Sequence, residues 1–167
     1  SRSAKSALVV LDMPFGSYEI SPTQALENGI RAMKESGAAA LKIEGARTEQ
    51  IKALVEAGIP VMGHVGFTPQ TVHALGGFKV QGRGESADKI LKECLAIQAA
   101  GAFAVVLEMV PAELAAQITK KLEIPTIGIG AGNQTDAQIL VWTDFAGLSE
   151  KMPSFAKQYL NLRQDLL

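Results

Sequence analysis

The chain has 167 residues, the size of one domain with enough material for a substantial core. Hydrophobic residues make up 47% and charged residues 20%, which is typical of a globular protein rather than a disordered or fibrous one. Sixteen basic and seventeen acidic residues give a net charge of −1, so charge does not favour binding to nucleic acid or to an anionic membrane. The single cysteine, Cys94, has no partner for an internal disulfide, which favours a reducing cytoplasm.

Short apolar runs alternate with amphipathic segments along the chain. The run at residues 7–11 is typical of a strand buried on both faces. Ser21 followed by Pro22 predicts a helix start, and Gly37 ends that helix. Further strands are predicted at 39–44, 60–65, 103–107, 125–129 and 137–142, and further helices at 49–57, 87–100, 113–122 and 155–167.

This alternation predicts an α/β protein whose parallel strands are joined by right-handed crossovers. The six predicted strands fit a doubly wound sheet of this length with nothing missing. A closed (β/α)₈ barrel needs eight strands and usually about 250 residues. Periodicity alone does not choose between these two architectures.

Polar or ionisable residues end the successive apolar runs. Asp12 ends the first run, Lys42 and Glu44 the second, His64 the third and Glu108 the fourth. In parallel α/β proteins ligands bind outside the carboxyl ends of the strands, so these residues are candidates for one site. The alternative for each of them is that it is simply the first solvated residue after a strand.

Lys42 and Glu44 are two residues apart in a predicted strand, so their side chains point to the same side. They form either a charged site or a buried ion pair kept for packing. Glu108 lies between apolar neighbours, which predicts desolvation and a raised pKa suited to a general acid or base. The alternative is a glutamate that caps the next helix. Asp12 together with Glu44 offers carboxylates for a hard cation such as Mg²⁺.

Two glycine-rich stretches accompany these candidates. Glycines flank His64, which allows close approach of a ligand, although a purely structural histidine fits equally well. Residues 76–84 form a basic, glycine-rich loop that is either a mobile lid or a plain surface loop. The glycines at 128, 130 and 132 match neither a dinucleotide fingerprint nor a phosphate-binding P-loop.

Six stretches, taken together and in this order, resemble the ketopantoate hydroxymethyltransferase family. They are residues 12–18 (DMPFGSY), 42–45 (KIEG), 63–70 (GHVGFTPQ), 76–83 (GGFKVQGR), 107–111 (LEMVP) and 127–132 (IGIGAG). The resemblance implies an α/β, (β/α)₈ TIM-type barrel of the phosphoenolpyruvate/isocitrate lyase kind. It also implies hydroxymethyl transfer from 5,10-methylenetetrahydrofolate to 3-methyl-2-oxobutanoate, which gives 2-dehydropantoate for pantothenate synthesis.

The same resemblance implies roles for the matching residues. Glu108 is expected to be the catalytic base, while Asp12, Lys42 and His64 bind the oxo acid. Asp12 and Glu44 are expected to hold Mg²⁺, which stabilises an enolate. The family also implies a cytoplasmic homo-oligomer, a decamer or similar, whose partners are the small oxo acid and the folate.

One departure from the family pattern concerns the first two strands, because no segment here matches them. Residues 1–167 are therefore expected to form a single barrel domain that is incomplete at its N-terminus relative to the family. Two alternatives remain at this point. One is another Mg²⁺-dependent oxo-acid lyase or mutase of the same superfamily, and the other is a truncated, non-catalytic chain.

Overall fold

A computed structural model describes residues 4–167 and contains six strands and six α-helices in that range. The strands are β1 (Val10–Asp12), β2 (Ala40–Glu44), β3 (Val61–Gly66), β4 (Ala104–Glu108), β5 (Thr126–Ile129) and β6 (Ala137–Gln138). The helices are α1 (Pro22–Ser36), α2 (Thr48–Glu56), α3 (Ser86–Ala99), α4 (Ala112–Lys121), α5 (Trp142–Phe145) and α6 (Leu162–Leu166), with a short 3₁₀ turn, η1 (Pro69–Thr71). None of these helices combines the length and apolar character that crossing a bilayer requires.

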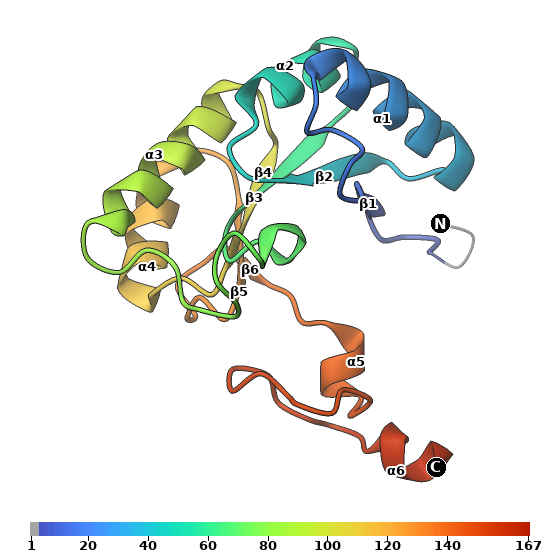
Figure 1. The fold of residues 1–167 in the computed structure, drawn as a ribbon, viewed down its shortest axis with the longest axis vertical. Helices are drawn as coiled ribbons and strands as arrows, with labels where there is room; N and C mark the ends of the chain where they lie inside the picture. The colour runs from blue at the N-terminus through green and yellow to red at the C-terminus, as the bar shows by residue number, and fades with distance from the viewer. Residues whose placement is uncertain (1–3) are drawn as a thin grey trace.

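The strands form one parallel sheet in the order β1-β2-β3-β4-β5-β6. Helices α1 to α4 form an arc along one side of this sheet, which curls inside the arc (Figure 1). A doubly wound sheet reverses its strand order and carries helices on both faces, so that alternative is wrong. A curled parallel sheet in sequential order is instead the arrangement from which α/β barrels are built.

The sheet separates two apolar layers according to the alternation of its side chains. Leu41 and Ile43 of β2 pack toward the helices in the larger core cluster, which also contains the free Cys94. Burial raises the pKa of the Cys94 thiol to about 12, as expected for a packing residue. The smaller cluster, which includes Met62 and Val106, lies on the inner side of the curled sheet.

Local sequence signals explain where α1 begins and ends and how closely α3 approaches the sheet. Ser21 caps α1 by accepting a hydrogen bond from the Gln24 amide at 3.1 Å, and Gly37 ends the helix with a φ of 63°. Gly63 in β3 leaves room for α3, because a Cβ atom there would lie 2.6 Å from Ile97. The caps thus set the bounds of α1, and the missing side chain of Gly63 lets α3 pack closely against the outer side of the sheet.

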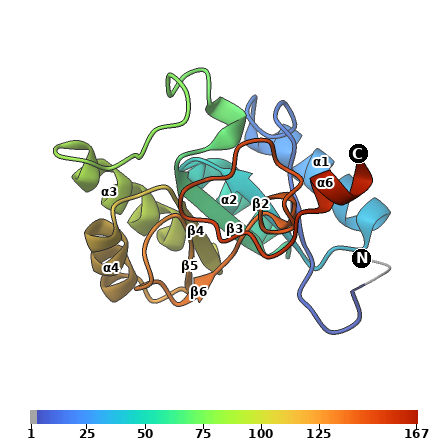
Figure 2. The same cartoon turned by 90° about the horizontal axis from the view of Figure 1, so that it is seen from below.

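The predictions fail at the first strand and toward the C-terminus. The strand expected at 7–11 as buried on both faces forms only over Val10–Asp12 and is half-buried to exposed, because β1 is an edge strand. The strand expected at 137–142 ends at Gln138, and Trp142 begins α5. The helix expected at 155–167 exists only over Leu162–Leu166. Apolar residues in this segment that suggested regular structure, among them Tyr159 and Leu160, are exposed. The segment lies apart from the arc of helices α1 to α4 (Figure 1). Seen from below, it is drawn over the strands (Figure 2).

Candidate active site

All five candidate residues lie at, or within two residues of, the carboxyl ends of four adjacent strands. Asp12 ends β1, Glu44 ends β2 and Glu108 ends β4, while Lys42 and His64 lie within β2 and β3. Strand register pairs Asp12 with Lys42, and Glu44 with His64. Since parallel strands end at one edge of the sheet, residues that are far apart in sequence meet here.

Lys42 is the cation of this cluster. Its Nζ lies 2.8 Å from Oδ1 of Asp12 and 3.2 Å from Nδ1 of His64. An ammonium group can only donate hydrogen bonds, so Nδ1 of His64 must act as the acceptor. The neutral imidazole then carries its proton on Nε2. Lys42 therefore determines the tautomer of His64.

His64 connects the cluster to Glu108. Its side chain is 3% exposed, and Nε2 lies 3.1 Å from Oε2 of Glu108. The direction of this contact is not that of a hydrogen bond, so Nε2 is a buried nitrogen without a hydrogen-bond partner among residues 4–167. A buried polar atom without a partner costs folding free energy, and functional sites are where such a cost is retained.

Glu44 is the most buried carboxylate of the cluster. Oε1 lies 3.7 Å from Nδ1 of His64, and Oε2 accepts a hydrogen bond of 3.0 Å from the Gln70 amide. Burial raises the pKa of Glu44, while His64, the Gln70 amide and Lys42 act in the opposite direction. The carboxylate is thus desolvated but held in place by specific partners.

Tyr18 and Gln70 form a second layer behind Glu44. The Tyr18 hydroxyl donates to Oε1 of Gln70 at 2.7 Å and accepts from the Glu44 amide at 3.2 Å. The Gln70 side chain in turn donates to the carbonyl oxygen of Met13 at 2.8 Å. Both residues belong to the stretches that carry the family resemblance, but nothing in the local sequence assigned them a role, because their contacts span 26 to 57 residues of chain.

The backbone around Glu108 is tightly constrained. The Phe67 amide donates to the carbonyl oxygen of Glu108 at 2.8 Å. Gly66, with a φ of 91°, lies so close that a Cβ atom there would collide with that carbonyl oxygen. Met109 follows with a φ of 48°, the one positive value outside glycine among residues 4–167. Such strained conformations cluster at functional sites, where the surrounding structure enforces them.

The carboxylates of the cluster have the chemistry of ligands for a hard cation. Asp12, Glu44 and Glu108 provide three carboxylates against the single ammonium of Lys42. Among residues 4–167, no group of three or more His, Cys, Asp and Glu side chains is arranged to hold a metal ion alone. Two carboxylates on neighbouring strands, completed by water and ligand oxygens, suit Mg²⁺, which keeps several such oxygens. They do not suit zinc, which takes nitrogen and sulfur ligands.

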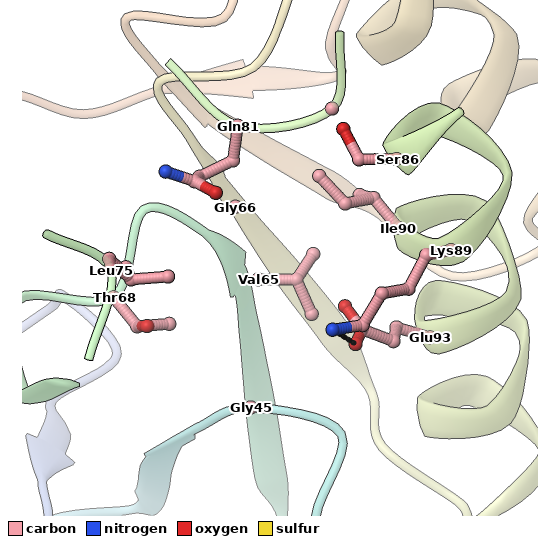
Figure 3. A pocket seen from close by; sticks show the side chains of 11 residues that line it. Gly45, Val65, Gly66, Thr68, Leu75, Gln81, Ser86, Lys89, Ile90 and Glu93 are labelled. Carbon is pink, nitrogen blue, oxygen red and sulfur yellow. Dashed lines mark ion pairs between the residues drawn. The ribbon is translucent and has the colours of Figure 1, made fainter. Parts of the chain in front are cut away.

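A cavity of about 200 Å³ lies on the helix-covered side of β3 (Figure 3). Val65 and Ile90 line its apolar part, and Lys89 and Glu93 of α3 approach to 3.8 Å at its edge. Burial raises the pKa of Glu93, and the nearby Lys89 partly opposes this. None of the five candidate residues lines this cavity, so it is separate from the polar cluster.

Comparison with known proteins gives a family match. The sequence profile described as ketopantoate hydroxymethyltransferase matches residues 1–167. Similar curated proteins are named 3-methyl-2-oxobutanoate hydroxymethyltransferase. The one from Acidothermus cellulolyticus is 60% identical over 98% of this chain, and the one from Corynebacterium efficiens is 58% identical over 99%. The chain covers 61% and 62% of those two relatives, or about three fifths of their length.

Solved structures resemble the fold at low sequence identity. A putative phosphonomutase from Burkholderia cenocepacia J2315 aligns with a TM-score of 0.52 at 17% identity, over 71% of this chain and 52% of that one. The carboxyl transferase domain of Rhizobium etli pyruvate carboxylase aligns with a TM-score of 0.54 at 10% identity, over 78% of this chain and 26% of that one. These likenesses show a parallel α/β fold and nothing about activity.

Proposed function

The chain belongs to the ketopantoate hydroxymethyltransferase family, and from this premise we propose that the full-length protein transfers a hydroxymethyl group from 5,10-methylenetetrahydrofolate to 3-methyl-2-oxobutanoate. The product is 2-dehydropantoate, which serves pantothenate biosynthesis. The observation that carries this proposal is the convergence of Lys42, His64 and Glu108, with the partnerless Nε2 of His64 facing the Glu108 carboxylate at 3.1 Å.

Lys42 and His64 are the proposed binding groups for the oxo acid. The ammonium of Lys42 offsets the negative charge of the substrate, and Nε2–H of His64 supplies the donor that no described residue satisfies. Asp12 lies against the same ammonium at 2.8 Å and completes this side of the site. An anion bound here would lie next to Glu108.

Glu108 is the proposed base. It takes the C3 proton of the oxo acid, and the electron pair left at C3 forms the new C–C bond to the methylene carbon of the donor. Both C–N bonds to that carbon break, and water supplies the hydroxyl oxygen. The proton from C3 and one proton from water end on the two donor nitrogens, so the transfer involves no net oxidation.

Asp12 and Glu44 are the proposed ligands of Mg²⁺, because they supply the carboxylate oxygens on neighbouring strands. When bound, Mg²⁺ would act as a Lewis acid that offsets charge on the keto and carboxylate oxygens of the substrate. In this arrangement Gln70 holds one oxygen of Glu44 and thereby fixes the direction of the carboxylate.

The wider setting is also part of the proposal. The sequential parallel strand order supports an eight-stranded (β/α)₈ barrel of the phosphoenolpyruvate/isocitrate lyase kind in the full-length protein, with residues 1–167 as one portion of that single domain. Family membership supports a cytoplasmic homo-oligomer. The buried, unpaired thiol of Cys94 agrees with a reducing compartment.

Exchange of the C3 proton for deuterium tests the proposal, because this step needs the oxo acid and Mg²⁺ but no donor. Glu108→Gln should abolish exchange measured by NMR while calorimetry still detects oxo-acid binding. The matched control is Glu123→Gln, which alters an exposed glutamate beyond α4 and should leave exchange unchanged. Exchange at the wild-type rate in Glu108→Gln would remove this residue from the role of base. Adding the donor then distinguishes transfer from C–C cleavage by the product formed.

A further inference from the structure

A larger cavity of about 550 Å³ lies at the carboxyl ends of β4 and β5. Its walls are predominantly apolar and come from the ends of β3, β4 and β5, the glycine-rich loop and the C-terminal segment. Phe67, Phe78 and Phe155 provide the aromatic surface, and Glu108 belongs to the same lining. Cavities of this size and character are typical of small-molecule sites, which range from roughly 300 to 1,000 Å³.

Glu108 belongs both to the lining of this cavity and to the polar cluster. Its carboxylate lies 3.1 Å from Nε2 of His64 on one side and lines the cavity on the other. Two reactants, one held by Lys42 and His64 and the other in the cavity, would therefore meet at the same carboxylate. The polar cluster suits a small anion, whereas the cavity suits a larger ligand with an apolar, flat surface.

The aromatic residues indicate the shape of that ligand. Phe67 is fully buried and Phe78 is 78% exposed, yet their ring centroids are 4.8 Å apart with an angle of 34° between the planes. The loop that carries Phe78 is tied down by a 2.9 Å hydrogen bond from the Gln81 amide to the carbonyl oxygen of Met109. An exposed ring held in this way offers a stacking surface for a planar heterocycle.

Two charged residues in the lining complement such a ligand. Asp144 accepts a hydrogen bond from Ser149 and offers carboxylate oxygens to ring N–H groups. Lys151 supplies a cation from the C-terminal segment. A donor that combines a nitrogen-rich ring with a carboxylate-bearing tail matches both charges.

We propose that this cavity binds the reduced bicyclic ring of the one-carbon donor, with Phe78 stacked on the flat pyrimidine half of that ring and the methylene carbon directed toward Glu108. The inference rests on the proposed function and specifies where the second reactant binds. Under this inference the glycine-rich loop at residues 76–84 binds a substrate and is not a plain surface loop. Phe78 is then a substrate-binding residue for the donor and has no part in binding the oxo acid.

The test separates the two substrates in the full-length protein. Phe78→Ala should raise KM for 5,10-methylenetetrahydrofolate about tenfold, while KM for the oxo acid and the rate of C3 deuterium exchange stay within about twofold. Phe78→Tyr keeps the ring and should restore the KM for the donor. Phe15→Ala, which alters another exposed phenylalanine outside this lining, is the matched control. Because Phe78 is exposed, its replacement leaves the core intact.

Calorimetry with tetrahydrofolate alone measures binding independently of turnover. Weaker tetrahydrofolate binding to Phe78→Ala than to Phe15→Ala supports the cavity assignment. This holds even if the wild-type protein shows no transfer, because the absence of transfer would overturn only the proposed reaction. An unchanged KM for the donor in Phe78→Ala overturns the inference and leaves the reaction standing. Equal loss of donor and oxo-acid kinetics also overturns it, since a general structural effect would do the same. A wild-type protein that neither binds tetrahydrofolate nor exchanges the C3 proton overturns both.

Discussion

The main-chain amide of Gln70 donates a 3.0 Å hydrogen bond to Oε2 of Glu44, across 26 residues of sequence. The Gln70 side chain accepts from Tyr18 and donates to Met13, so a residue of η1 is joined to the ends of β1 and β2 at once. The orientation of a strand carboxylate therefore depends on residues outside the sheet. Changes in this second layer should affect the site without touching a ligand.

Replacing Tyr18 with phenylalanine tests that dependence. The variant leaves the buried Glu44 amide and Oε1 of Gln70 without the hydroxyl that joins them. We expect the free energy of unfolding to fall by about 1–3 kcal/mol in urea denaturation, because buried polar groups lose their partner. Tyr159→Phe is the control, since Tyr159 is 66% exposed and should change stability by less than about 0.5 kcal/mol. Equal stabilities of the two variants would contradict this role.

Titration of Tyr18 provides a pH-dependent test. Burial, more than nearby carboxylates, raises the pKa of Tyr18 from 10.0 to about 12. A pKa that is higher in the folded state contributes stability that is fully present below pH 10 and lost as the pH rises through about 12. In the Tyr159→Phe variant Tyr18 is the remaining tyrosine of this chain, so near-ultraviolet difference spectra follow it alone. Ionisation near pH 10 in the folded variant would show that the phenol is not buried as described.

Replacing Gly66 with alanine tests the close approach of β3 to β4, and the same replacement at Gly58 is its control. Both have positive φ values, 91° and 86°, but a Cβ atom at Gly66 would collide with the carbonyl of Glu108, whereas nothing lies within 4 Å of one at Gly58. Gly58→Ala should cost about 1–2 kcal/mol from backbone strain alone. Gly66→Ala should cost about 1–3 kcal/mol more or prevent folding. Thermal unfolding compares them, and equal losses would mean that the contact with Glu108 contributes nothing.

The sequence predicted the strands and helices well where one local signal dominated. The Ser21 cap and Gly37 determine the bounds of α1, and the alternation in β2 correctly separated Lys42 and Glu44 from Leu41 and Ile43. Periodicity alone did not determine the strand order, because that order depends on long-range pairing. The family resemblance did, since it implied a barrel-type sheet with sequential parallel strands, the order that is found. The C-terminal segment was predicted wrongly, since large apolar residues such as Trp142, Tyr159 and Leu160 remain exposed and only the short helices α5 and α6 form.

The sequence indicated the candidate site only as a set of residues at strand ends. Parallel strands bring such ends together, so the meeting of Asp12, Lys42 and Glu108 follows from the fold class. The contacts between side chains of different strands were not predictable. The link from Lys42 to Nδ1 of His64 and the partnerless Nε2 both arise from strand register. The role of Tyr18 was not predictable either, because it depends on a hydrogen bond to Gln70, which lies 52 residues further along the chain.

Lys42→Met tests whether the ammonium of the cluster binds the oxo acid. The variant keeps the length of the side chain but leaves Asp12 without its cation, and it removes the donor that fixes the His64 tautomer. Because a charged hydrogen bond contributes about 1.5–3 kcal/mol, we expect the Kd for 3-methyl-2-oxobutanoate to rise about 10- to 100-fold in calorimetry. Lys52→Met is the control, because Lys52 is exposed on α2 and pairs with Glu56 at 3.8 Å. Binding at wild-type strength in Lys42→Met would show that the substrate carboxylate is recognised elsewhere, and a similar loss in both variants would mean that the effect is not specific to the site.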